Sequence, residues 1–428
     1  MRKVTQALNT FLIMLFLFPV VALAGVDSGF SVGAKTEWVD NIEKSSFERD
    51  SGVINTLLLK ANLSDQESSY SYGIKYEADY RDYSGGEYDT NLYLTGNTYL
   101  NLELIPDRLA WNNKLRSAIT ERDSRLPSVP SNQDQRNTIT TSPVLTLVNT
   151  KRDRVVLKGT LEKNVYRERS QNDSDRYKAY LDYSHAISKL ALVGVACGFA
   201  SADFDTDTGY DSLSCKLVSR KRIKQGVIAF ELGQRQVEPD RGDDFEGAEY
   251  SLTANLELGL DRLYVYSSRE VTDTVDGFYG SDFTRNSRTL QDTNTDLLSL
   301  TVRKRSEIGY ERSFSSVSKA SVFAFVAIDD LHRSDLDTER EGVGFNYFRT
   351  ISATTSFEFY SLFQKTEFGG GAVPLFLSYS TDYLAALNRD LSEAFRLRGW
   401  LRAEDRRSKT ETATYEAYIV GLSALYSF

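Results

Sequence analysis

The sequence predicts an all-β protein: a transmembrane antiparallel β-barrel of roughly 20 strands, within a range of about 16 to 20. Three observations support this prediction. Apolar and polar residues alternate with period two along most of the chain, short turns alternate with long polar loops, and the last strand is amphipathic and ends on an aromatic residue. The 428 residues include 25 Tyr and 23 Phe but only 7 Pro, and the mean hydropathy is −0.38. That average describes a soluble chain, because a mean does not register an alternation.

The first 24 residues have the composition of a cleaved export signal. Arg2 and Lys3 form a basic region, 11–21 form an apolar segment, and Ala22–Ala24 form a small-residue cleavage site. The apolar segment is shorter than the ~20 residues of a membrane-spanning helix. We therefore expect cleavage after Ala24 and a barrel over 25–428 with a net charge of −11. Such an acidic chain, without a basic patch, predicts no nucleic-acid partner. The alternative is an uncleaved amphipathic N-terminus.

The period-two pattern defines strands with one apolar and one polar face. From 70 to 80 the even-numbered residues are apolar or aromatic, and the odd-numbered ones are small, polar or charged. The segments 91–104, 177–183, 250–257 and 395–402 alternate in the same way. A strand separates the two sets onto opposite faces, whereas a helix would mix them. In a membrane barrel the apolar face contacts lipid and the polar face lines a wet lumen; in a soluble sandwich the polar face would meet bulk water.

Short turns and long polar loops alternate, which favours the membrane barrel, because such barrels have short turns at one end and long loops at the other. Most of the predicted turns are spaced by about 34 to 45 residues, the repeat of one long hairpin. The interval 261–317 exceeds one hairpin, so we expect 272–297 to form a pore-constricting or ligand-contacting loop. The predicted turns are centred near residues 65, 107, 152, 188, 221, 260, 318, 353 and 391.

The C-terminal segment 415–428 resembles the closing strand of bacterial outer-membrane barrels. In that class the terminal Phe and the alternating apolar residues are read by the barrel-assembly machinery. The closing strand must pair with the first strand, because an open sheet edge in lipid leaves backbone groups unsatisfied. This resemblance implies a multi-pass location in the outer membrane of a Gram-negative bacterium, with membrane lipid and lipopolysaccharide as partners. The residues that carry the assembly signal are Val420, Leu422, Tyr426 and Phe428.

The alternation assigns a mixed set of charged and tyrosine side chains to the lumen. Opposite charges on facing walls would tune the passage of hydrophilic solutes, and tyrosines would stack on sugar rings. The alternative is that these side chains pair with one another and fill the interior. The predicted pore-lining residues are Lys75, Glu77, Asp79, Arg81, Tyr93, Tyr99, Lys158, Glu162, Lys178, Tyr180, Asp182, Arg396, Arg398 and Arg402.

The two cysteines are predicted to face each other across a hairpin centred on Thr206. In an oxidising compartment Cys197 and Cys215 form either a structural cross-strand disulfide or a pair of small thiols on the apolar face. Nothing in the sequence places an activated thiolate there.

The chemistry-bearing residues are too few to predict an enzyme. Two histidines leave little material for metal binding or catalysis, so we expect no catalytic residue, no metal site and no cofactor. Asp330-Leu331-His332, with the acidic residues at 203, 205 and 207, resembles the constellation of the omptin surface proteases, which are smaller barrels. That hydrolase is the weakest alternative.

Three local features resemble the β-barrel porin family that accompanies exopolysaccharide and exosortase (PEP-CTERM) systems. They are Trp38-Val39-Asp40-Asn41, the segment 140–145 and the sequence Arg-Ser-Phe-Ser at 312–315. The resemblance implies a channel or scaffold without known catalytic residues, and exopolysaccharide export components as partners. Pro143 lies inside a strand of this pattern and removes one backbone donor, so we expect a bulge there.

The function predicted from these features is an outer-membrane channel. The strand pattern begins by 30–38, which leaves no room for a plug domain, and a barrel of this size without a plug encloses a water-filled lumen. We expect it to pass small hydrophilic or saccharide solutes or to serve exopolysaccharide export. The alternative is a non-conducting scaffold of an exopolysaccharide export system.

Overall fold

The computed structural model describes residues 27–47, 49–84, 88–122, 126–205, 208–273, 300–331, 337–369, 376–409 and 411–428. The predicted export signal lies outside these residues, as does nearly all of the expected loop 272–297. Within the described residues, no helix has the length and apolar character needed to cross a membrane.

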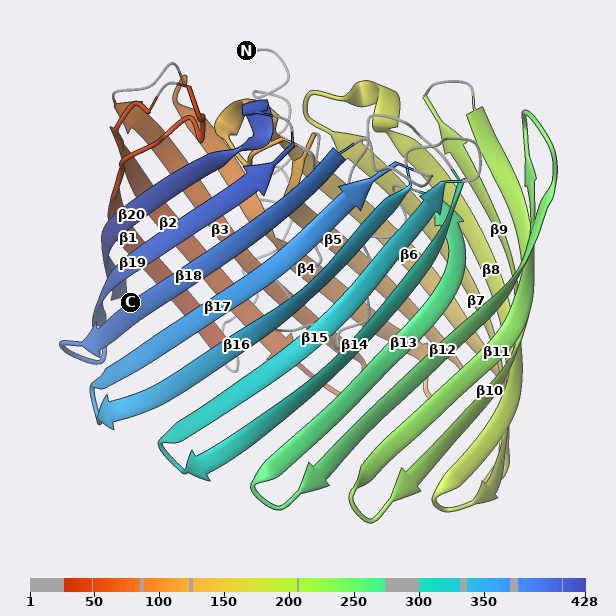
Figure 1. Ribbon diagram of the computed structural model, residues 1–428. Helices are drawn as coiled ribbons and strands as arrows, with labels where there is room; N and C mark the ends of the chain where they lie inside the picture. The colour runs from red at the N-terminus through yellow and green to blue at the C-terminus, as the bar shows by residue number, and fades with distance from the viewer. Residues whose placement is uncertain are drawn as a thin grey trace.

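Twenty strands make up one antiparallel sheet that closes on itself (Figure 1). The first ten are β1 (Asp27–Val39), β2 (Gly52–Gln66), β3 (Tyr70–Ser84), β4 (Asn91–Ile105), β5 (Leu109–Glu121), β6 (Gln133–Asn149), β7 (Asp153–Tyr166), β8 (Ser174–Ser188), β9 (Ala191–Phe204) and β10 (Thr208–Ile223). The remaining ten are β11 (Gly226–Pro239), β12 (Phe245–Leu258), β13 (Asp261–Asp273), β14 (Leu300–Ser315), β15 (Ser318–Leu331), β16 (Thr338–Ser352), β17 (Thr355–Phe368), β18 (Phe376–Asp390), β19 (Phe395–Ser408) and β20 (Tyr415–Ser427).

Every strand pairs with its neighbour in sequence, and β20 pairs with β1 to close the ring. The closing register runs from Ser31 opposite Ser427 to Val39 opposite Ile419. The backbone amide of Phe428 adds a hydrogen bond of 2.8 Å to the carbonyl of Phe30. The prediction of a closed antiparallel barrel of roughly 20 strands is confirmed.

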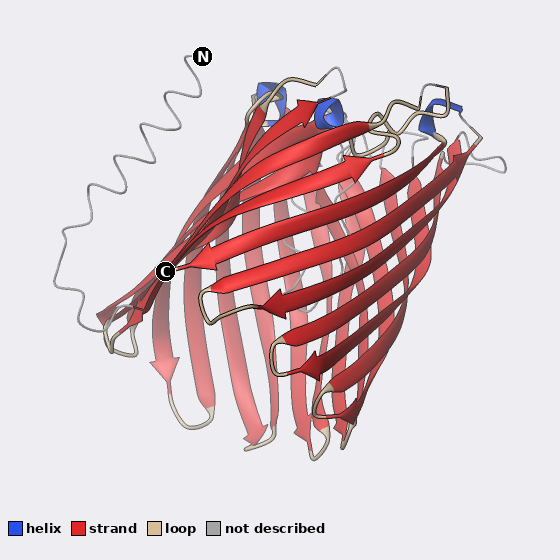
Figure 2. Ribbon diagram, turned by 90° about the vertical axis from the view of Figure 1, so that its left-hand side faces the viewer, coloured by secondary structure: helices blue, strands red, loops and turns tan. Residues whose placement is uncertain are grey.

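Short turns connect the strands at one end of the barrel and longer loops connect them at the other (Figure 1). All nine predicted turns fall at strand connections, although the turns predicted near 65 and 221 lie a few residues later, at 67–69 and 224–225. Loop 409–414, between β19 and β20, was not predicted. Short 3-10 helices of the described residues lie at the same end as the long loops (Figure 2): η1 (Pro130–Asn132), η2 (Ser170–Asn172) and η4 (Glu411–Ala413).

The alternation along each strand separates an outward apolar face from an inward polar one. On β2, Leu57 and Leu59 are 48% and 51% exposed on the outside, while Leu58 between them is 8% exposed on the inside. Comparable exposed Leu, Val, Phe and Tyr side chains recur on the outer face of most strands. A contiguous apolar surface of this extent is typical of proteins surrounded by lipid.

Pro143 is accommodated differently from the expectation. The pairing of β6 with β7 keeps the same register on both sides of Pro143, so the predicted bulge at that residue is wrong. Gly159 lies opposite, and a Cβ there would stand at an ordinary van der Waals distance of 3.4 Å from the proline ring, so the ring fits the ladder without a shift of register at that residue. The register shifts only later, between Thr146 and Val148.

Candidate functional site: the barrel lumen

All the residues that the alternation assigned to the lumen lie on the inward face. On β7 and β8 they alternate with exposed outward residues such as Leu157, Leu161 and Tyr177. On β3 and β19 they share a face with residues that line an internal cavity. The predicted residues divide by strand into Lys75, Glu77, Asp79 and Arg81 on β3, Tyr93 and Tyr99 on β4, Lys158 and Glu162 on β7, Lys178, Tyr180 and Asp182 on β8, and Arg396, Arg398 and Arg402 on β19.

A cavity of about 940 Å³ occupies the lumen between the walls formed by β1 to β3 and β16 to β20. Of the predicted residues, Glu77, Asp79, Arg81, Arg398 and Arg402 line it. A second cavity of about 470 Å³ lies beside the short turns and includes Arg396 and Arg398 in its wall. Tyr93, Lys158, Lys178 and the other predicted residues of β4, β7 and β8 lie on other parts of the inner wall.

The charges around the larger cavity are paired rather than isolated. Lys60 Nζ lies 2.6 Å from Glu77, Arg81 lies 3.0 Å from Asp79, and Arg398 lies 3.1 Å from Glu358. Arg396 pairs with Asp390 at the turn end, at 2.6 Å. Pairing fixes each side chain, so the wall presents ordered donors and acceptors to a solute instead of mobile charges.

One chain of ion pairs connects the long loop 40–51, between β1 and β2, to β18 and β19. Lys44 Nζ lies 2.6 Å from Glu404, Arg402 lies 3.0 Å from Glu404, and Arg402 also donates two hydrogen bonds of 2.9 Å to Asp382. Burial alone would lower the pKa of Lys44, but the charges of Glu404 and Tyr415, together with the hydrogen bond to Glu404, outweigh it and raise the pKa to about 12. Lys44 is therefore charged at neutral pH and holds the loop against the wall.

The β5–β6 hairpin leaves the barrel wall and enters the lumen at the end where the long loops lie. Pairing of β5 with β4 stops at Ser117, opposite Gly96, although both strands continue. Side chains replace the lost ladder: Gln135 accepts from the Leu94 amide at 3.1 Å, and Arg167 donates to the Leu92 carbonyl at 3.0 Å.

The segment 126–130 that follows lies across the barrel mouth. Leu126, Val129 and Pro130 line the larger cavity together with Ile42 and Arg406. Arg406 of β19 donates a hydrogen bond of 3.2 Å to the Leu126 carbonyl. Burial raises the pKa of Tyr88, in the neighbouring loop. The segment thus narrows the lumen on the side of the long loops.

Buried ion clusters elsewhere on the inner wall were not predicted. Asp329 lies between Arg303, at 2.6 Å, and Arg340, at 3.7 Å. Glu249 lies between Lys216, at 3.0 Å, and Arg235, at 2.8 Å. The same alternation, applied to β11, β12 and β14 to β16, indicates the polar face of these strands, but the partners depend on register between strands.

A polar network of the same kind joins β6, β7 and the loop after β7. Arg136 and Thr138 both donate to Asn164 Oδ1, at 2.9 and 2.8 Å, and Arg169 pairs with Asp134 at 3.3 Å. All of these side chains are buried. Buried charges that are paired and hydrogen-bonded fix the local geometry, because loss of one partner leaves the other desolvated.

Aromatic side chains lie flat over glycines on the inner wall. A Cβ added to Gly73, Gly198, Gly309 or Gly421 would overlap the ring of the residue directly opposite, which is Tyr99, Tyr180, Tyr264 or Trp400. Phe323 and Phe325 cover Gly344 and Gly342 in the same way. Such cross-strand aromatic–glycine pairs protect the glycine backbone and help to set strand register. Two of the rings, Tyr99 and Tyr180, belong to the tyrosines that the sequence suggested as sugar-stacking groups.

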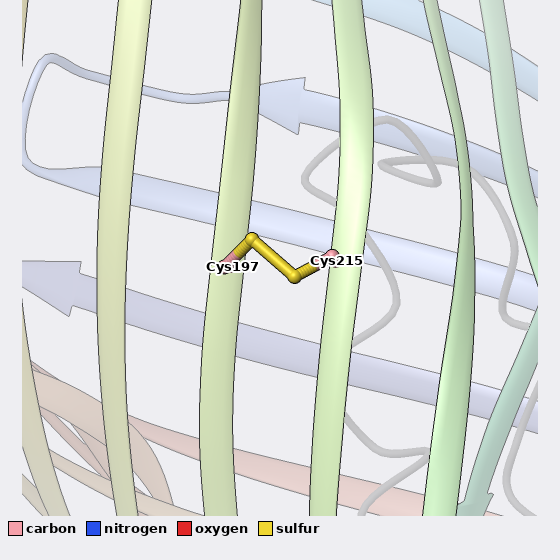
Figure 3. Close-up of a disulfide and its surroundings, with 2 residues drawn as sticks. All are labelled: Cys197 and Cys215. Atoms are coloured by element: carbon pink, nitrogen blue, oxygen red, sulfur yellow. A yellow bond between two sulfur atoms is a disulfide. The ribbon is translucent and has the colours of Figure 1, made fainter.

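Cys197 and Cys215 are joined in a disulfide across β9 and β10 (Figure 3). They are direct cross-strand partners with Cα atoms 4.1 Å apart. Both share the outward face with Val195, Phe199 and Leu213. The bond therefore lies on the lipid-facing side of the barrel and contributes nothing to the lumen wall.

The described residues do not assemble the hydrolase constellation. Asp203 is on β9 and Asp330 on β15, with five strands between them in the ring, while His332 and Asp207 lie outside the described residues. Among the residues that the structure describes, no group of three or more His, Cys, Asp and Glu side chains is arranged to hold a metal ion.

Comparison with known proteins supports the fold and gives no closer relationship. No family model matches the chain, and no curated protein matches it significantly. Among solved structures, the FrpB iron transporter from Neisseria meningitidis matches in its F5-1 apoprotein form with 7% identity and a TM-score of 0.50, and in its F3-3 variant with 9% identity and a TM-score of 0.50. Each match covers 95% of this chain and 82% of the transporter. OccK3 (OpdO) from Pseudomonas aeruginosa matches with 11% identity and a TM-score of 0.44, covering 94% of this chain and 96% of that one. At these identities the likeness concerns the fold alone: this chain has the architecture of the large Gram-negative outer-membrane β-barrels.

Proposed function

We propose that this protein is an outer-membrane channel that passes small hydrophilic solutes, saccharides among them. The observation that carries the proposal is a closed barrel with an apolar exterior and a charged interior that encloses a cavity of about 940 Å³. A polar interior with ordered donors and acceptors is what the water-filled lumen of a porin-like barrel presents to a hydrophilic solute. Its surroundings would be membrane lipid and lipopolysaccharide, and its assembly would depend on the barrel-assembly machinery.

The test is a conductance measurement on purified protein in planar bilayers. We expect discrete current steps from protein whose unboiled form migrates anomalously on gels, the mark of a folded barrel. A folded barrel that gives no steps would overturn the channel function.

A second function is favoured by two specific observations. The charges around the larger cavity are paired, and segment 126–130 lies across the mouth. Both suit a closed barrel that acts as a non-conducting scaffold, and the resemblance to porins of exopolysaccharide systems suggests export components as its partners. A silent but folded barrel that copurifies with such components would support this scaffold.

A further inference from the structure

We propose that Trp400 is a stacking platform for the ring of a neutral saccharide in the larger cavity. This inference deepens the proposed channel function by naming the class of solute, and it rests on that function. It begins with the position of the side chain. Trp400 lies on the inward face of β19, opposite Ala386 of β18 and Gly421 of β20, and it lines the cavity.

The orientation of the indole follows from the glycine beside it. A Cβ on Gly421 would overlap indole atoms Cε2 and Cζ2, so the ring covers the position where that side chain would stand. On an inward-facing residue the Cβ points from the wall into the lumen. A ring that covers this direction lies parallel to the wall, with one face on the backbone and the other toward the cavity. Ala386, the partner of Trp400 on β18, is too small to cover the face of the indole that points toward the cavity.

The groups around the indole suit hydroxyls better than a free charge. Arg398 and Arg402 flank Trp400 on the same strand face, and each is held by a carboxylate, Glu358 at 3.1 Å and Asp382 at 2.9 Å. Lys35, near Gly421 in the register, pairs with a neighbouring glutamate at 2.7 Å. An anionic solute would have to compete with these carboxylates, whereas a neutral sugar uses the remaining donors and acceptors. A few placed polar groups around an aromatic surface are what small-molecule sites employ.

The fluorescence of Trp400 itself can report whether a saccharide binds. The chain has three tryptophans, and the other two face outward: Trp38 is 45% exposed and Trp111 is 41% exposed on the apolar face. In a Trp38→Phe/Trp111→Phe protein, the tryptophan fluorescence, excited at a wavelength that tyrosine does not absorb, comes from the lumen alone.

The experiment titrates this single-tryptophan protein, in detergent, with maltohexaose as the neutral probe and tetragalacturonate as the anionic one. We expect a saturable change in fluorescence with maltohexaose and at least tenfold weaker binding of tetragalacturonate. Gly421→Val displaces the indole from the wall while retaining it, and should abolish the response. Gly399→Val is the matched control, because Gly399 faces outward on β19, next to Trp400, and its Cβ would approach nothing closer than 3.9 Å. The fluorescence response of this variant should persist.

Three results would overturn the platform: no response to maltohexaose, an undiminished response in Gly421→Val, or tighter binding of tetragalacturonate. If Gly421→Val fails to fold, Trp400→Leu replaces it, and calorimetry should then show at least tenfold weaker maltohexaose binding than in the parent protein; equal binding would sink the proposal. Current recordings on the same proteins separate the two ideas. Conductance without binding refutes the platform alone, and binding without conductance refutes the channel alone.

Discussion

Outward-facing tyrosines near the short turns donate hydrogen bonds to aspartates at strand ends. Tyr183 donates to Asp153 at 2.9 Å, and Tyr310 donates to Asp261 at 2.6 Å. This pairing explains why Asp-Arg-apolar begins β7 and β13: the aspartate accepts the hydroxyl of a tyrosine whose ring faces lipid. Tyrosines with an apolar ring and a polar tip are typical of the membrane interface. The same Asp-Arg-apolar sequence also occurs at 107–109, where the aspartate differs: Asp107 adopts a positive φ of 58° in the turn before β5.

The disulfide gives a stability prediction at the same scale. Cys197→Ser/Cys215→Ser should fold into the same barrel but unfold more easily, because the bond constrains a loop of sequence separation 18 in the unfolded chain. The loop-entropy estimate is about 3 kcal/mol. The measurement is the temperature at which the compact gel form converts to the unfolded form, with and without reductant. Reductant should lower this temperature in the parent protein and leave the double variant unchanged; an insensitive parent would contradict the prediction.

At the scale of elements, the inward turn of the β5–β6 hairpin is the main departure from a regular barrel. It costs ladder hydrogen bonds between β4 and β5, which Gln135 and Arg167 partly replace. The apolar residues of segment 126–130 then line the same cavity as Ile42, in the loop that Lys44 anchors. This arrangement makes the hairpin end, rather than the wall, the narrowing element among the described residues.

Shortening segment 126–130 should increase the current that a single barrel carries. We expect replacement of 126–130 by two glycines to raise the single-channel conductance at least twofold, because the segment no longer lies across the cavity. The matched control removes Gly242–Asp244, in an exposed loop at the same end that does not line the cavity. Equal steps for the parent and the shortened protein would show that 126–130 does not limit the current.

At the scale of the whole molecule, closure depends on the last strand. Val420, Leu422, Tyr426 and Phe428 lie exposed on the outer face of the seam, and Tyr426 packs edge-on against Phe428 with ring centroids 4.9 Å apart. The alternate residues Gly421, Ser423, Leu425 and Ser427 face the lumen, and β20 meets β1 in register from Ile419 to Ser427. The seam therefore combines backbone pairing with lipid-facing apolar residues. That the assembly machinery recognises these apolar residues stays a prediction.

Two neighbouring positions on β20 test the direction of its faces. Leu422→Arg places a cation on the lipid face and should destabilise the inserted barrel by about 2–4 kcal/mol. Ser423→Arg, one residue later, faces the lumen and should leave the unfolding midpoint in lipid nearly unchanged. The measurement is denaturant unfolding in liposomes. Similar midpoints for both variants would mean that the inside and outside of this strand are wrongly assigned.

The local pattern of the sequence was sufficient for most of the fold and for the composition of the lumen wall. Alternation placed Glu77, Arg81 and Arg402 on the inner face, because a side chain's face depends only on its position along its own strand. Turn spacing located the hairpins, because each short turn is formed by residues that are adjacent in the sequence. The bulge expected at Pro143 is wrong because register is a property of the strand pair: β6 and β7 keep one register on both sides of the proline, which no pattern within β6 alone indicates.

The sequence alone therefore determined a closed barrel with an apolar face, a polar face and unequal ends, since these are consequences of period and turn chemistry within each hairpin. The tertiary structure alone decided which side chains contact one another inside the lumen. Lys44 meets Glu404 across 360 positions of sequence, the indole of Trp400 lies on Gly421, and segment 126–130 reaches Arg406. These contacts depend on the relative register of strands and on the closure of the ring, and no local pattern encodes either one.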